Sequence, residues 1–158
     1  MRLQDFLVTD ALVPQVRASE PGEAIAELID ALVAAGAVPA ELRQELLDQF
    51  MERERSGSTG FGKGVAVPHV KHERLPRMVG TIGISPAGID FNALDREPVY
   101  SIVMLLSPRD APDQHLQAME NIFSNLQNAA FRRLLRQANT PQALAELIQE
   151  ADTQQLPS

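Results

Sequence analysis

Apolar residues recur every three or four positions in the first third of the chain, which is the spacing of an amphipathic helix. Residues 19–36 are predicted to form a helix that is capped by Ser19 and ended by Gly36 in a left-handed conformation. A second helix is predicted to start after Pro39 and to continue as far as Glu54. Its inward-facing side chains are expected to be Leu42, Leu46, Leu47 and Phe50.

The middle third has short apolar runs typical of strands. Residues 79–84 are predicted to form one strand and residues 99–106 another, with turns and a loop between them at 85–88 and 92–95. The second run is apolar almost throughout, so we expect a central strand that is covered on both faces.

The last third returns to helical spacing. A helix after Pro112 is predicted to bury Leu116, Met119, Ile122, Phe123 and Leu126. A shorter helix follows around residues 131–136, and the last one has Thr140 as its cap and Pro141 in its first turn. Helices before and after a block of strands predict an α/β fold with a mixed β-sheet sandwiched by helices. One domain is expected over residues 1–152, followed by a C-terminal tail at 153–158.

Composition and charge exclude several kinds of protein. The 158 residues contain no cysteine, so disulfides, thiolate metal sites and cysteine nucleophiles are ruled out. No run of 18 apolar residues and no secretory signal are present, and we therefore expect a cytoplasmic protein without membrane insertion. The net charge of −7 makes nucleic acid a poor partner. Three histidines are the only side chains that ordinarily titrate near neutral pH.

Glycines are concentrated between the second helix and a short apolar run that ends at Pro68-His69. The segment contains Gly57, Gly60, Gly62 and Gly64. It does not match the phosphate-binding P-loop, because Gly64 stands where Ser or Thr would bind magnesium and because the segment follows a helix rather than a strand. Either it is a flexible connection, or the backbone must approach a ligand closely there.

Each histidine allows a structural and a functional interpretation. His69 follows Pro68 at the end of a strand, where open α/β sheets place ligand sites, and the glycines before it favour function. His72 makes an H-x-x-H spacing with His69, but the segment is not helical in pattern, so an exposed loop histidine is expected rather than a metal ligand. His115 is either a surface histidine near a helix start or a donor to an anion bound beside His69. No metal or cofactor is predicted.

The segment from Arg53 to His69 resembles the phosphorylation-site region of the fructose/mannitol-type (type 2) enzyme IIA of the bacterial phosphotransferase system. The run Ser58-Thr59-Gly60 is most similar to the nitrogen-regulatory branch of that family. The resemblance extends over roughly residues 3–150. Lys71 matches the family pattern, whereas Val70 stands where many relatives have Gly, which affects the expected shape of the loop.

The resemblance implies a function for several residues. His69 would be the nucleophile that accepts a phosphoryl group from the phosphocarrier protein HPr or its nitrogen-branch counterpart, and His115 would stabilise that group. Arg53 and Thr59 would lie close to the site. The loop around the phosphate would comprise Gly60, Gly62 and Gly64. The resemblance also implies the enzyme IIA fold over residues 1–152.

Four functional hypotheses follow. The first is a phosphoryl-relay protein that regulates other proteins according to its phosphorylation, favoured by Ser58-Thr59-Gly60 and by the absence of a fused partner domain. The second is a sugar-transport component that passes the phosphoryl group to a IIB domain. A metal-dependent hydrolase would instead use His69, His72 and His115. The fourth is an interaction module that has lost phosphorylation.

Overall fold

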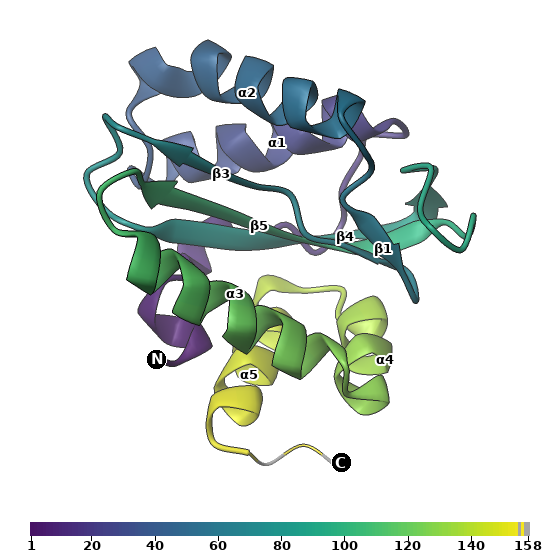
Figure 1. Cartoon of the computed structure of the whole chain (residues 1–158). Helices are drawn as coiled ribbons and strands as arrows, with labels where there is room; N and C mark the ends of the chain where they lie inside the picture. Colours follow the sequence, from purple (N-terminus) through teal and green to yellow (C-terminus); the bar gives the residue numbers. More distant parts are fainter. Residues whose placement is uncertain (155, 157–158) are drawn as a thin grey trace.

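Helices cover both faces of one mixed β-sheet in the computed structural model, which describes residues 1–154 and 156 (Figure 1). One face is covered by α1 (Pro21–Ala34) and α2 (Arg43–Arg55). The other is covered by α3 (Pro112–Leu126), α4 (Ala129–Gln137) and α5 (Pro141–Asp152). Short 3-10 helices lie at Leu3–Asp5, Thr9–Ala11 and Ala40–Leu42. The predicted fold class is confirmed. Of the predicted tail, residues 155, 157 and 158 lie outside the described residues.

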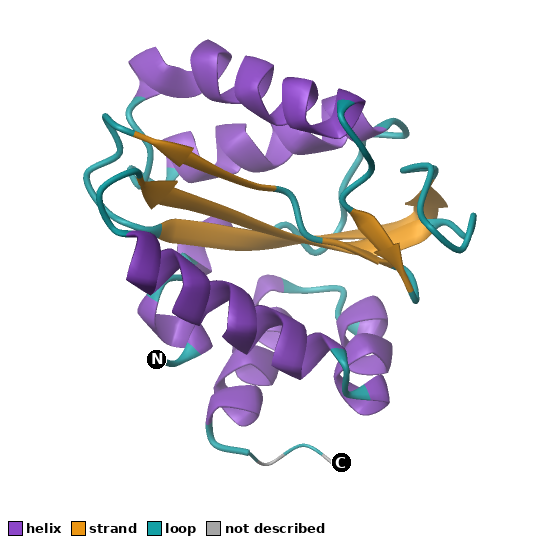
Figure 2. Ribbon diagram, viewed as in Figure 1, coloured by secondary structure: helices purple, strands orange, loops and turns teal. Residues whose placement is uncertain are grey.

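The sheet is built around one buried strand that pairs with three others (Figure 2). The strands are β1 (Gly60–Gly62), β2 (Val65–Ala66), β3 (His69–His72), β4 (Val79–Ile89) and β5 (Val99–Pro108). β5 pairs in parallel with β2 and β3 along one side and antiparallel with β4 along the other. β1 pairs antiparallel with β2, so the glycine-rich segment forms a small hairpin at the end of the sheet.

Alternate side chains of β5 enter two separate hydrophobic clusters. Ile102 and Met104 belong to the cluster under α1 and α2, whereas Val103 and Leu105 belong to the cluster under α3, α4 and α5. This alternation follows from the period of two residues along a strand. The prediction of a central strand covered on both faces is therefore confirmed.

Most predicted helix ends agree with the structure. Gly36 has a φ of 75°, as the predicted left-handed C-terminal residue requires, and Thr140 accepts a hydrogen bond from the backbone N–H of Ala143 at 3.1 Å. The prediction for Ser19 is wrong, since α1 begins at Pro21 and Glu20 occupies the capping position without a side-chain bond. In the part of the chain described, no helix has both the length and the hydrophobicity of a membrane span.

Two further corrections concern strand and helix faces. β4 continues through the predicted turn at 85–88 to Ile89, with an irregular register after Ile84. On α3, Leu116 was expected in the core but is 58% exposed, and the neighbouring His115 is buried instead. The buried face of α3 consists of His115, Ala118, Ile122 and Leu126.

Candidate functional site

A proline interrupts the pairing of the sheet just before His69. β2 and β3 both run parallel to β5, and Val67 and Pro68 separate them. The Val67 N–H donates to the carbonyl of Thr59 at 3.1 Å, and the Pro68 carbonyl accepts from the N–H of Leu105 at 3.0 Å. The Val67 carbonyl is turned instead toward the His69 ring, whose Nδ1 lies 2.9 Å away.

The contact with Val67 determines which nitrogen of His69 carries the proton. A carbonyl oxygen can only accept a hydrogen bond, so Nδ1 must donate. In the neutral ring Nε2 then keeps its lone pair, and it has no hydrogen-bond partner among residues 1–154 and 156. The half-buried side chain of His69 therefore presents a nucleophilic nitrogen from a backbone that Pro68 makes stiff.

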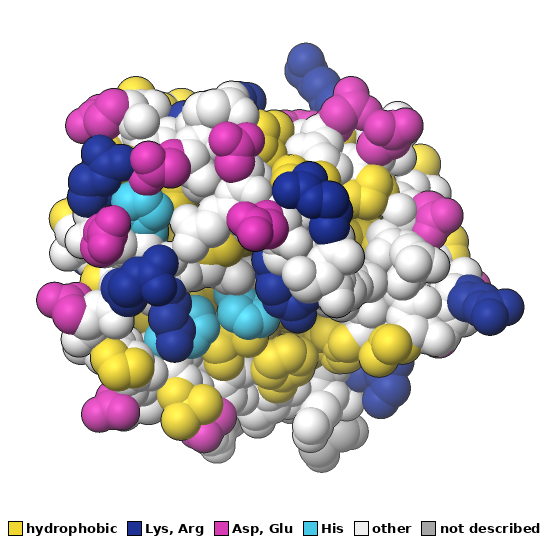
Figure 3. Space-filling model, turned by 45° about the horizontal axis from the view of Figure 1, so that its top comes forward, with side chains coloured by type: hydrophobic (Ala, Val, Ile, Leu, Met, Phe, Trp, Pro, Cys, Tyr) yellow, Lys and Arg dark blue, Asp and Glu magenta, His cyan; other side chains and the backbone are white. Residues whose placement is uncertain are grey.

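The structure brings His115 next to His69. The two ring centroids are 5.7 Å apart, with the planes inclined by 48°. Figure 3 shows the histidine side chains on one face of the molecule, with hydrophobic and basic side chains beside them. His115 lies in the first turn of α3, and its Nδ1 is 2.6 Å from the hydroxyl oxygen of Ser107, which is fully buried at the end of β5.

His115 is uncharged at neutral pH. Burial lowers its pKa to about 4, with smaller electrostatic contributions from His69 and Lys71. A neutral imidazole can donate a hydrogen bond without adding a full positive charge to the site. The pair could therefore hold an anionic group without a full positive charge on His115.

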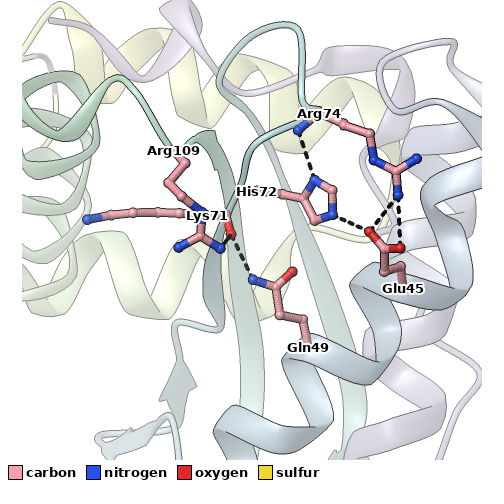
Figure 4. Close-up of polar contacts among 6 residues, drawn as sticks. All are labelled: Glu45, Gln49, Lys71, His72, Arg74 and Arg109. Carbon is pink, nitrogen blue, oxygen red and sulfur yellow. Dashed lines mark hydrogen bonds and ion pairs between the residues drawn. The ribbon is translucent and has the colours of Figure 1, made fainter.

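Two cations, Lys71 and Arg109, lie at the neighbouring ends of β3 and β5. Lys71 lies two residues after His69 and therefore on the same face of β3. Its backbone carbonyl accepts hydrogen bonds from Gln49 Nε2 at 2.7 Å and from Arg109 Nη2 at 3.4 Å (Figure 4). Arg109 follows β5 directly, so the ends of two neighbouring strands contribute positive charge to this edge of the sheet.

His72 is buried, which corrects the expectation of an exposed loop histidine. Its Nδ1 accepts from the backbone N–H of Arg74 at 3.0 Å, and its Nε2 bonds to the carboxylate of Glu45 on α2 (Figure 4). Arg74 Nη2 lies 2.8 Å from the same carboxylate. These hydrogen bonds, first from Arg74 and then from His72, hold the pKa of Glu45 below its ordinary value. His72 therefore joins β3 to α2.

The direction of the side chains on β3 bears on the hydrolase hypothesis. His69 faces α3 and His115, whereas His72 faces α2, because residues three apart on a strand point to opposite faces. The two histidines therefore do not share a metal ion. Within residues 1–154 and 156, no three His, Asp or Glu side chains are grouped so that they could hold one.

Arg53 and Thr59 are engaged in local contacts on the segment that leads to the site. Arg53 Nη1 donates to the carbonyl of Gly57 at 2.7 Å. The hydroxyl of Thr59 donates to the carboxylate of Glu54, which also accepts from the Thr59 backbone N–H at 3.2 Å. Both side chains thus shape the connection between α2 and β1, and the Thr59 carbonyl fixes Val67.

The three glycines predicted for the phosphate loop lie in and beside the β1–β2 hairpin. Gly62 and Gly64 have φ angles of 104° and 77°, which residues other than glycine rarely adopt. The Gly60 N–H donates to the hydroxyl of Ser58 at 2.9 Å, and the Gly64 carbonyl accepts from the N–H of Tyr100 at 2.8 Å. The glycines therefore allow a tight, internally bonded turn.

The sequence did not single out Ser107 or Arg109. The only signal for Ser107 is a hydroxyl at the end of an apolar strand, eight residues before His115. Arg109 is a single basic residue in a loop between a strand and a helix. Both residues lie beside β3 because β3 pairs with β5 in a register that sets Ser107 opposite Lys71 and Pro108 opposite His72.

Fold and site define a small α/β protein in which the rings of His69 and His115 lie next to each other where β3 pairs with β5. The chain belongs to the family described as "Phosphoenolpyruvate-dependent sugar phosphotransferase system, EIIA 2", which matches residues 6–151. It is therefore a component of phosphotransferase type.

Relatives in this family differ in role and in length. A nitrogen regulatory protein of Pseudomonas aeruginosa is 35% identical over 105 residues, covering 66% of this chain and 68% of that protein. The fructose-specific EIIABC component of Bacillus subtilis is 26% identical over 152 residues, or 96% of this chain. The chain spans only 24% of the length of that second relative.

Solved structures share the fold at low sequence identity. The nitrogen regulatory protein IIA-Ntr of Neisseria meningitidis superposes with a TM-score of 0.81 at 22% identity, covering 91% of this chain and 97% of that one. The mannitol enzyme IIA of Escherichia coli, solved in complex with phosphorylated mannitol enzyme IIB, gives 0.73 at 19% identity and covers 89% of this chain and 94% of that one.

Proposed function

We propose that the chain is a phosphoryl-relay protein in which His69 accepts a phosphoryl group from an HPr-type phosphocarrier. The observation that carries the proposal is the fixed Nδ1–H of His69, which leaves Nε2 unpartnered beside the neutral ring of His115. The family match supports this use of a histidine, since the family takes its name from the phosphotransferase system.

The transfer is an exchange of one nitrogen–phosphorus bond for another. The lone pair of His69 Nε2 forms a bond to phosphorus while the bond to the carrier's histidine breaks, and the departing ring keeps that electron pair. Phosphoryl transfer asks the protein mainly for in-line positioning and stabilisation of the equatorial oxygens. His115 would donate to one oxygen from Nε2–H, with Nδ1 accepting from the hydroxyl of Ser107.

Other groups have supporting roles in this proposal. Lys71 and Arg109 would attract the anionic group without forming a dedicated cage. Arg53, Thr59 and the glycines at 60, 62 and 64 would hold the segment that positions Val67, and through it the tautomer of His69. No metal or cofactor takes part in the proposed transfer.

An apolar patch beside the histidines is proposed as the surface on which the carrier docks. Leu116 is 58% exposed on α3 directly after His115, and Met119 lies half-buried nearby. The ring of Phe61 packs edge-on against Phe123 with centroids 5.1 Å apart. Exposed apolar side chains around a reactive residue are typical of a surface that meets another protein.

Mass spectrometry after incubation with phosphoenolpyruvate, enzyme I and HPr tests the relay. We expect one added phosphoryl group that is lost in acid, as a phosphohistidine is. His69→Ala should abolish it, whereas His115→Ala should retain it at a rate lower by about tenfold or more. An unmodified wild-type protein, or a modified His69→Ala variant, would overturn the proposal.

We propose a regulatory role in the cytoplasm, carried by residues 1–152 as the enzyme IIA unit. The run Ser58-Thr59-Gly60 and the nitrogen regulatory relative support it. The alternative is a transport component that passes its phosphoryl group to a IIB domain, as the fructose-specific relative suggests. Phosphorylated protein should transfer nothing to fructose or mannitol IIB domains if the role is regulatory; rapid transfer would favour the alternative.

A further inference from the structure

Four basic side chains line a cavity between α4 and the turn of the β1–β2 hairpin. Figure 1 shows β1 and α4 close to one another at this end of the sheet. The cavity has a volume of about 490 Å³. Its lining consists of Lys63, Ala129, Arg132, Arg133, Arg136 and Gln137, without an acidic side chain. Pockets of this size commonly hold small molecules. Neither His69 nor His115 lines it.

The positive charge of this basic cavity is not neutralised by the protein. Among the described residues, none of its four cations forms an ion pair with a carboxylate. The carboxylate of Asp95 is close to Lys63, but it accepts backbone N–H bonds from Lys63 at 2.9 Å and Glu97 at 3.0 Å. In a chain with 21 acidic and 14 basic residues, four unpaired cations around one cavity point to an anion that comes from outside.

Two of the guanidinium groups are held in place before any ligand arrives. Arg136 stacks on the ring of Tyr100, with its central carbon 3.6 Å from the ring centroid. Arg132 Nη1 donates to the carbonyl of Leu126 at 2.6 Å. The two arginines are four residues apart on α4 and repel each other, which an anion between them would relieve. A preorganised cation loses less conformational entropy when it binds.

We propose that the basic cavity binds a small anion that carries at least two phosphate groups. A guanidinium fork matches phosphate oxygens in geometry, and one phosphate alone would leave most of the four cations unpaired. A free polyphosphate and the phosphate chain of a nucleotide share this chemistry. Since Lys63 lies between Gly62 and Gly64, the ligand would also hold the hairpin against α4 and raise the unfolding temperature.

Isothermal titration calorimetry with tripolyphosphate and, separately, ATP tests the proposal on the whole chain. We expect saturable one-to-one binding of the wild type, a thermal shift that grows with ligand concentration, and affinity reduced at least about tenfold by Arg133→Glu. Arg133 is exposed, so this variant should fold. The matched control is Arg17→Glu, which makes the same charge change at an exposed arginine that precedes α1.

The two ligands distinguish the sources of the phosphate groups. Equal affinities would mean that the phosphate chain alone is recognised, and tighter binding of ATP would mean that the nucleoside adds contacts; both support the cavity. Arg136→Gln serves as a second variant and should also weaken binding. Absence of binding by the wild type, or an equal loss in Arg17→Glu and Arg133→Glu, would overturn the proposal. None of these results depends on phosphorylation of His69.

Discussion

Two serines on β5 are buried to the same degree but differ in their hydrogen bonding. Ser107 is within 2.6 Å of His115 Nδ1, whereas the hydroxyl of Ser101 has no hydrogen-bond partner among the described residues. A buried hydroxyl stabilises the fold only when it is paired, and otherwise its desolvation costs free energy. Ser101 therefore provides an internal reference for the contribution of Ser107.

We predict that Ser107→Ala lowers the free energy of unfolding by about 1–2 kcal/mol, because it leaves a buried ring nitrogen without a partner. It should also slow phosphorylation of His69, since His115 loses the bond that orients its ring. Ser101→Ala should be neutral or slightly stabilising and should not change the rate. Urea unfolding and the rate of phosphoryl incorporation measure both effects. Equal behaviour of the two variants would contradict this role for Ser107.

At the residue scale, the sequence pointed to the pair of histidines but not to the residues around them. His69 and His115 could be singled out because histidines are few and a proline and glycines precede one of them. The partner of His115 could not, because a serine in an apolar strand gives no sign of the side chain it faces. The same holds for Glu45, which lies 27 residues before His72 and meets it only through the packing of α2 on β3.

At the scale of elements, the least predictable feature was β3. Its four residues are two histidines, a valine and a lysine, a composition that indicates a loop. They form a strand because β5 offers a full row of backbone partners from Leu105 to Pro108. Burial of His72 then depends on α2. Helices with a long apolar stripe were predicted well, except that on α3 the stripe could not show that His115 replaces Leu116 in the core.

Close packing of strands leaves no room for a side chain at one glycine of β4. A Cβ atom on Gly80 would lie 2.5 Å from the backbone carbonyl oxygen of Met104 on β5. Gly80 also exchanges backbone hydrogen bonds of 2.9 Å with Phe6 and Val8 on its other side, so it cannot move away freely. Gly22 on α1 differs, because a Cβ there would meet only the flexible end of Met51 at 3.3 Å.

We predict that Gly80→Ala lowers the free energy of unfolding by about 2–3 kcal/mol, as expected for overpacking against a rigid backbone. Gly22→Ala should be neutral or stabilising by up to about 1 kcal/mol, because alanine favours the helix. Chemical denaturation of the two variants beside the wild type measures the difference. If Gly80→Ala were as stable as Gly22→Ala, the strands would not be packed as closely as the structure describes.

At the scale of the whole molecule, four groups with a lowered pKa make the fold sensitive to acid. Asp5, Glu45 and Asp95 each have a pKa below its ordinary value, which is 3.8 for Asp and 4.5 for Glu. The main cause is hydrogen bonding to their carboxylates. Stability from these groups is lost only as the pH falls below these ordinary values. His115 acts at higher pH, because its pKa falls from 6.5 to about 4 on folding.

Between these two values the unfolded chain binds a proton at His115 that the folded protein excludes, so stability must rise with pH through this window and level off above it. We predict that unfolding of the wild type becomes easier by about 1–2 kcal/mol from pH 6.5 down to about pH 5, where the carboxylates still contribute little. His115→Gln should flatten this part of the curve, since glutamine does not titrate. Urea unfolding at closely spaced pH values measures the slope for both proteins. An unchanged slope in His115→Gln would mean that His115 is protonated as readily in the folded protein as in the unfolded chain, and its assignment as the neutral donor beside His69 would then fail.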